Sequence, residues 1–224
     1  MVETSYSNPV FYGGDCGNNS FSYAQRKAAW SQCILLIPAI KKIDSLSIDL
    51  WHDIVCEEYD DSIVSCTWLA HMYERWKIKI FDNHNYALYR WLQNPMHVIH
   101  IDQHSDMWLR SWAIDMSRLD DQRYIYDLTN FDVHIGNFVS AYLTIQTCTQ
   151  LRTQSCVLDH KPVGRYILDI DCDFWAPEML NTHRPQTINK VRDMMRYAEM
   201  VTIATSPYFI DQQQAIDIIH QLCA

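Results

Sequence analysis

Apolar and polar positions alternate in short blocks from residue 77 onward. Short apolar runs predict strands, and apolar residues at a spacing of three to four predict helices between them. The predicted strands pass through Ile78, Ile80 and Phe81 and cover residues 98–102, 166–171 and 200–204; the predicted helices cover residues 86–92, 187–198 and 212–222. Strands that alternate with helices favour a parallel sheet with both faces covered. We therefore predict an α/β fold with three α/β/α layers and a mainly parallel sheet.

The N-terminal part of the chain has a different pattern. Residues 1–22 contain Gly13, Gly14 and Gly17 and are predicted to form loops and turns. From there to residue 76 the apolar positions recur mostly at helical spacing. We expect residues 1–76 to be mainly helical and to lack metal-binding motifs. No low-complexity linker separates this part from the rest, so residues 1–224 are predicted to form a single domain.

Charge and hydropathy argue against two classes of partner. The formal net charge is −9 and the 18 Lys and Arg residues are scattered, so we predict no nucleic-acid partner. The longest apolar stretch, residues 33–40, contains Pro38 and is too short to span a bilayer, so we predict no membrane insertion.

Cysteine spacing and the first residues bear on the compartment. None of the eight cysteines forms a CxxC pair, and the N-terminus MVETSYS lacks the basic and apolar regions of a signal peptide. We expect a cytoplasmic protein with reduced, buried thiols. The sequence leaves the oligomeric state open.

Metal-binding side chains gather where the predicted strands end. Asp102, His104 and Asp106 occupy alternate positions after one strand, and Asp169 and Asp171 do so at the end of another. Side chains at alternate positions of an extended segment point to one side. Ligands of parallel sheets bind outside the carboxyl ends of the strands, so we expect these side chains to lie at one edge.

His84 adds an imidazole after the first predicted strand. Four carboxylates and two imidazoles without a thiolate motif favour manganese, iron or zinc over calcium, and Mn(II) is our first choice. Four carboxylates nearly neutralise two divalent ions, so we predict a dinuclear, hydroxide-bridged site that shares Asp102 and Asp169. Taken alone, each motif is also compatible with a solvated turn, and His84 with a capping or core histidine.

The three motifs resemble those of the ureohydrolase superfamily, which includes the arginases and agmatinases. Its Asp-x-His-x-Asp strand end resembles HVIHIDQHSDMW here, its later Asp-x-Asp strand end resembles YILDIDCDFW, and its first histidine ligand falls in DNHNYALYRW. The motifs follow in the superfamily's order and cover about residues 77–211. They are most similar to the compact peptide arginases, which convert arginine side chains of ribosomally made precursor peptides to ornithine and release urea.

This resemblance implies an arginase-like fold, two Mn(II) ions and an arginine-containing peptide as substrate. One ion would be bound by His84, Asp102, Asp106 and Asp169, and the other by His104, Asp102, Asp169 and Asp171. A hydroxide between the ions would attack the guanidinium carbon, and the amine would leave after protonation. Asp106 would also orient the hydroxide.

Three positions depart from the pattern of enzymes that act on free arginine. An Asn that helps to hold the substrate's α-carboxylate is replaced by Trp108, which favours a peptide substrate. The Gly-Asn-x-His segment of arginases, whose His shuttles protons, has Val139 in place of that His. We take His134 as the candidate proton shuttle, with a loop or core histidine as the alternative. Residues 202–207 lack the guanidinium-binding acid. Asp173 and Glu178 are possible replacements, or else carboxylates that are solvated or that support the metal ligands.

Several other functions stay open. A ureohydrolase of the same chemistry could act on free arginine or agmatine. A dinuclear phosphoesterase would usually carry a Gly-Asn-His triplet, and residues 136–138 lack its His. A deacetylase would use one zinc ion and fewer carboxylates. A non-catalytic binding module would not need all six candidate ligands.

Overall fold

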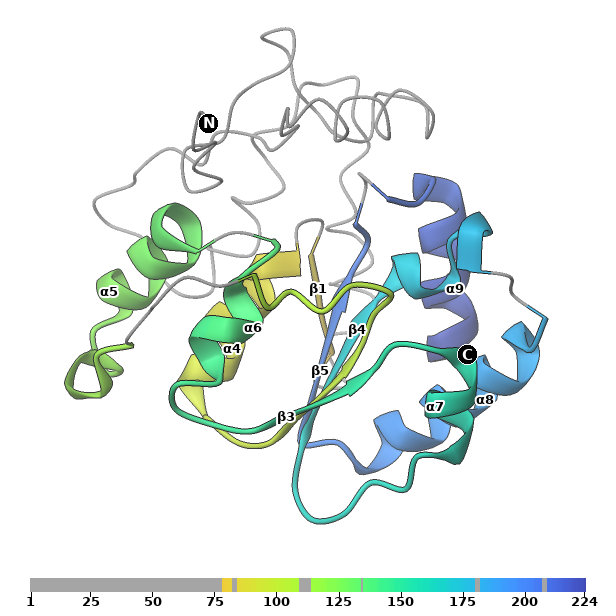
Figure 1. The fold of residues 1–224 in the computed structure, drawn as a ribbon, viewed down its shortest axis with the longest axis horizontal. Coiled ribbons are helices and arrows are strands. Elements are labelled where there is room, and N and C mark those ends of the chain that lie inside the picture. The colour runs from red at the N-terminus through yellow and green to blue at the C-terminus, as the bar shows by residue number, and fades with distance from the viewer. Residues whose placement is uncertain (1–77, 82–83, 109–113, 134, 180–181, 207–208) are drawn as a thin grey trace, which may run out of the picture.

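The computed structural model describes residues 78–81, 84–108, 114–133, 135–179, 182–206 and 209–224 (Figure 1). The strands are β1 (Ile78–Phe81), β2 (Val98–Ile101), β3 (Cys148–Leu151), β4 (Ile167–Asp171) and β5 (Met200–Ala204). The α-helices are α4 (Ala87–Gln93), α5 (Gln122–Asp127), α6 (Phe138–Tyr142), α7 (Gln154–Asp159), α8 (Arg184–Tyr197) and α9 (Gln212–Cys223). Shorter helical turns are η3 (His84–Tyr86), η4 (Met116–Arg118), η5 (Leu128–Asp132), η6 (Cys172–Trp175) and η7 (Pro177–Met179). The predicted N-terminal helical part, residues 1–76, lies outside the described residues.

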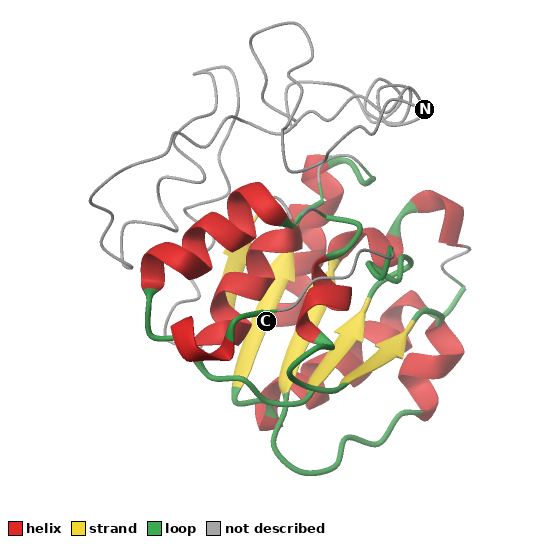
Figure 2. Ribbon diagram, turned by 60° about the vertical axis from the view of Figure 1, so that its left-hand side comes forward, coloured by secondary structure: helices red, strands yellow, loops and turns green. Residues whose placement is uncertain are grey.

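The described strands form one parallel sheet in the order β1-β5-β4-β2-β3. Helices α4 and α6 lie on one face and α7, α8 and α9 on the other, so the described part has three layers (Figures 1 and 2). This arrangement confirms the predicted α/β fold with a parallel sheet. Because all strands are parallel, their carboxyl ends share one edge of the sheet.

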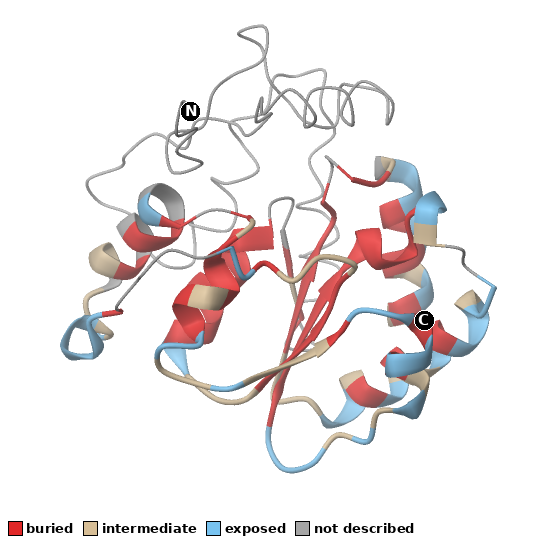
Figure 3. Cartoon of the chain, viewed as in Figure 1, coloured by how far each residue is buried: buried red, intermediate tan, exposed pale blue. Residues whose placement is uncertain are grey.

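Alternate residues of the central strands give the two faces different characters. Ile99 of β2, Ile170 of β4 and Ile203 of β5 belong to the apolar core shared with α7, α8 and α9. The residues between them face α4 and α6, and at the amino ends of β2 and β4 Val98 and Ile167 belong to the apolar core on that face. Figure 3 shows the central strands as largely buried, and every residue of β2 and β4 is buried. The polar residues on the second face are therefore enclosed by protein.

Local sequence signals set several helix ends. Thr153 caps α7 by accepting a hydrogen bond from the Cys156 amide, and Asp211 caps α9 through the amides of Gln213 and Gln214. Pro185 occupies the first turn of α8, where its missing N–H has no helical partner to lose. These caps hold the helices that cover the purely apolar face.

Two predictions, on membrane insertion and on the burial of the thiols, can be compared with the structure. No described helix combines the length and apolar character that a bilayer crossing requires. Among the described cysteines, Cys172 is buried as predicted, whereas Cys156 is exposed on α7, so the prediction of buried thiols is wrong for Cys156.

Candidate metal centre

Histidine and aspartate side chains converge at the carboxyl edge of β2 and β4. The structure brings together all six predicted ligands, His84, Asp102, His104, Asp106, Asp169 and Asp171, and adds His100 and Asp173 to them. Every member is buried except His104, whose side chain is 40% exposed. The cluster therefore has one open side, at His104.

Asp102 lies between two groups of potential ligands. Its Oδ2 atom lies 3.2 Å from Nδ1 of His84, which is also 3.3 Å from Asp106 Oδ2 and 3.0 Å from Asp171 Oδ2. Its Oδ1 atom lies 3.4 Å from Nδ1 of His104, which is 2.9 Å from Asp173 Oδ2. One carboxylate thus faces both groups, with one oxygen each.

Backbone conformation helps to hold the carboxylates of Asp106 and Asp171 in place. Asp106 has a left-handed conformation with φ of 51°, and its carbonyl accepts hydrogen bonds from the amides of Val139 and Ser140. Ser206, with φ of 45°, donates its hydroxyl to Asp171 Oδ2 at 2.6 Å. A non-glycine residue in this region costs about 1–3 kcal/mol and persists only where surrounding contacts hold it. Both strained residues lie at the cluster.

Part of the cluster forms a second, inner layer of polar residues, farther from the carboxyl edge of the sheet. His100, Asp169 and Thr202 occupy the same level of three neighbouring strands. Asp169 accepts hydrogen bonds from His100 Nδ1 at 2.7 Å and from Thr202 Oγ1 at 2.5 Å. The ring of His100 stacks on that of His84 with centroids 5.2 Å apart. The two layers are therefore in direct contact.

Mutual attraction and repulsion shift the pKa values of the cluster. Burial lowers the pKa of His100, but contacts with Asp102 and Asp169 outweigh burial and raise it to about 9. Burial also lowers the pKa of His104, but contacts with Asp102 and Asp173 outweigh burial and raise this pKa to about 11. Burial and repulsion by Asp102 raise the pKa of Asp106 to about 7. Without other cations, the carboxylates hold protons on their histidines.

Unpaired buried atoms fit a cation at this place. Within the described part of the chain, hydrogen-bond partners are lacking for His84 Nδ1, Asp102 Oδ2 and both carboxylate oxygens of Asp173. Buried charged groups with unsatisfied hydrogen-bonding atoms are costly unless they are well paired or coordinate metals. Each group combines one imidazole with several carboxylates, a donor set that suits Mn(II) among other divalent ions. The residues present thus fit the predicted metal centre in donor chemistry.

The other predicted site residues fall in different places. Asp173, predicted as a guanidinium partner, a solvated carboxylate or a carboxylate that supports the metal ligands, is fully buried beside His104, so only the solvated position is wrong for it. Glu178 is exposed on η7. Val139 is buried in α6, and His134 lies outside the described residues, so its role as proton shuttle stays a prediction. His100 escaped prediction although it precedes Asp102 by two residues and therefore shares its face of β2.

We compared the chain with known protein families, curated proteins and solved structures. The chain matches no protein-family model, no curated protein and no solved structure. The site must therefore be interpreted from its own chemistry.

Proposed function

We propose that this chain is a dinuclear, Mn(II)-dependent amidinohydrolase that converts arginine side chains of a peptide to ornithine and urea. The observation that carries the proposal is the position of Asp102, whose two oxygens face two separate groups of ligands. Such a shared carboxylate is what a pair of neighbouring ions requires. The order of the three motifs along the chain supports a guanidinium substrate, because it resembles the order in ureohydrolases.

The residues of the chain have distinct roles in this proposal. When bound, divalent ions would supply a Lewis acid and lower the pKa of water. Asp106 Oδ2 faces the first group, where this carboxylate can accept a hydrogen bond from a water and orient it. Ser206 orients Asp171 through its hydroxyl. The balanced reaction adds water across a C–N bond, so the amine takes up a proton as it leaves.

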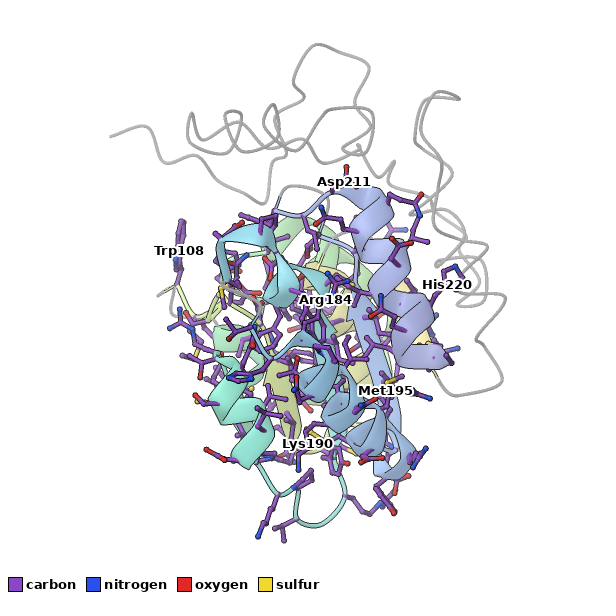
Figure 4. The ribbon with its side chains drawn as sticks, turned by 90° about the vertical axis from the view of Figure 1, so that its right-hand side faces the viewer. Trp108, Arg184, Lys190, Met195, Asp211 and His220 are labelled. Atoms are coloured by element: carbon purple, nitrogen blue, oxygen red, sulfur yellow. The ribbon has the colours of Figure 1, made fainter. Side chains whose placement is uncertain are left out.

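Aromatic residues close in sequence or in space to the candidate ligands favour a peptide over a free amino acid. Trp108, two residues after Asp106, is 54% exposed and projects outward from the molecule (Figure 4). The ring of Phe209 packs against His104 with centroids 4.7 Å apart. Aromatic surface is suited to a peptide backbone and offers no charge to an α-carboxylate.

Mass spectrometry tests the proposed reaction directly. The Mn-loaded chain is incubated with arginine-containing peptides, and we expect ornithine in place of arginine together with one urea for each residue converted. Free arginine and agmatine serve as competing substrates, and lysine-containing peptides serve as the control. Urea release from free arginine or agmatine at a rate equal to that from peptides would contradict the peptide assignment.

We expect Trp108→Ala to weaken peptide binding more than catalysis. Loss of an aromatic contact worth about 0.5–1.5 kcal/mol corresponds to a rise in KM of roughly 2–10-fold, with kcat nearly unchanged. Steady-state kinetics with one peptide and with agmatine measures the effect. Tyr197→Ala, which removes an exposed aromatic ring from α8, is the matched control. An equal rise in KM for agmatine would show that Trp108 does not contact the peptide.

A further inference from the structure

We infer that Asp169 is a positioning residue beneath the metal centre, and that β4 and the turn after it supply Asp171 and Asp173 as the ligands. This inference rests on the dinuclear site of the proposed function. It changes the ligand pair implied by the family resemblance, which was Asp169 and Asp171. Asp169, Asp171 and Asp173 occupy alternate positions, so the ligand pair could be the first two aspartates or the last two. Their contacts in the structure favour the last two.

Strand register is the first argument. Asp169 pairs with His100 of β2 and with Thr202 of β5, and Ile170 pairs with Ile101. Asp102 follows Ile101 directly, so the same register places Asp102 level with Asp171. Two residues of a strand span about 6.6 Å. The backbone of Asp169 therefore lies about that distance below Asp102, toward the amino ends of the strands.

The hydrogen bonds of Asp169 are the second argument. Its Oδ1 accepts the hydroxyl of Thr202, which in turn accepts Nε1–H of Trp91 at 3.2 Å. Its Oδ2 lies 2.7 Å from both His84 Nε2 and His100 Nδ1. Both oxygens of this carboxylate are therefore engaged by protein donors within a fully buried layer.

The unpaired atoms of the outer layer are the third argument. Both oxygens of Asp173 are buried and lack a hydrogen bond to any described residue, while its Oδ2 lies 2.9 Å from His104 Nδ1. Asp171 Oδ2 lies 3.0 Å from His84 Nδ1. The acceptors without a hydrogen bond thus belong to Asp173 and to Oδ2 of Asp102, since Asp171 already accepts the Asp173 amide and the Ser206 hydroxyl.

Asp169 then acts through His84. When Nε2–H of His84 is donated to Asp169, the lone pair of Nδ1 is left for the cluster centre, where it faces Asp102 and Asp171. A carboxylate that accepts the second N–H of a ligating imidazole fixes its tautomer and ring orientation. His100, held by the same oxygen, directs Nε2 to within 3.3 Å of Asp102 Oδ2.

Metal stoichiometry tests this assignment. Asp169→Asn, Asp173→Asn and the exposed control Asp159→Asn are dialysed against Mn(II), and bound metal is measured by elemental analysis and titration calorimetry. We expect Asp169→Asn to keep two ions per chain with affinity roughly 10–100-fold weaker, as is typical when a partner of a ligand is lost. We expect Asp173→Asn to hold one ion, and Asp159→Asn to behave like the wild type.

Two results would overturn the inference: fewer than two ions bound to folded Asp169→Asn, or two ions retained by Asp173→Asn. If circular dichroism shows that Asp169→Asn does not fold, the stoichiometry of Asp173→Asn decides alone. Nitrogen NMR of the Zn(II)-loaded wild type adds a readout that general destabilisation would not change, because His84 should carry its proton on Nε2 and the metal on Nδ1. If the wild type binds two ions but releases urea from no peptide, the proposed function fails while this assignment stands.

Discussion

Asp102→Asn will prevent the chain from holding both ions and will lower the hydrolysis of peptidyl arginine by roughly 10³-fold or more, because several kcal/mol of transition-state stabilisation depend on them. The Asn amide keeps the shape of the carboxylate but offers only one oxygen. Oδ1 and Oδ2 of Asp102 face different groups, so one group loses its shared ligand whichever way the amide is oriented. Elemental analysis gives bound Mn(II), and urea release at saturating peptide gives kcat.

The control for this variant is Asp159→Asn, which removes an exposed carboxylate at the end of α7. Its metal content and activity should equal those of the wild type. If Asp102→Asn keeps two ions and a tenth or more of the activity, Asp102 is not the shared ligand and the dinuclear proposal fails.

Metal affinity will rise steeply with pH. Burial opposes protonation of His84, yet the charges of Asp169 and Asp171 raise its pKa well above the usual range, and contacts with Asp102 and Asp173 raise the pKa of His104 to about 11. Both imidazoles therefore carry protons in the metal-free protein near neutral pH and must release them before they can bind an ion. Below these pKa values, each released proton strengthens binding about tenfold per pH unit, so the two imidazoles give about 100-fold, and the Asp106 carboxyl, with a pKa of about 7, adds to this rise.

Titration calorimetry between pH 6 and 7, in buffers of different ionisation enthalpy, counts these protons. The variant His160→Gln, on the opposite face of the sheet beyond α7, should release as many protons as the wild type. An affinity that stays constant over this range would show that the two histidines are neutral before the metal binds or that they do not bind it.

Four strands were predictable because most of their residues are apolar, as expected for strands buried on both faces. β3 escaped prediction because Cys148, Thr149 and Gln150 are only partly buried, and the strand pairs with β2 alone at the edge of the sheet. Helix α8 begins at Arg184, before the predicted start at residue 187, because Pro185 is well tolerated in a first helical turn.

The candidate site was predictable to the extent that it depends on local spacing. Alternation within one strand places Asp169 and Asp171 on the same side, and the structure agrees. Alternation does not predict which residue of β4 lies beside Asp102. That depends on the register between β2 and β4, which are separated by many residues in the sequence. Thr202 and Ser206 escaped prediction for the same reason, since only the neighbouring position of β5 brings their hydroxyls to these aspartates.

The backbone of Asp106 connects the cluster to helix α6. Its carboxylate lies 3.3 Å from His84 Nδ1, while its carbonyl accepts the amides of Val139 and Ser140 in the first turn of the helix. Any movement of Asp106 toward an ion therefore also acts on these two amides. The hydrogen-exchange rates of these two amides should therefore report whether the metal site is occupied. Exchange should be slower when an ion holds the Asp106 carboxylate in place and faster when the carboxylate is released.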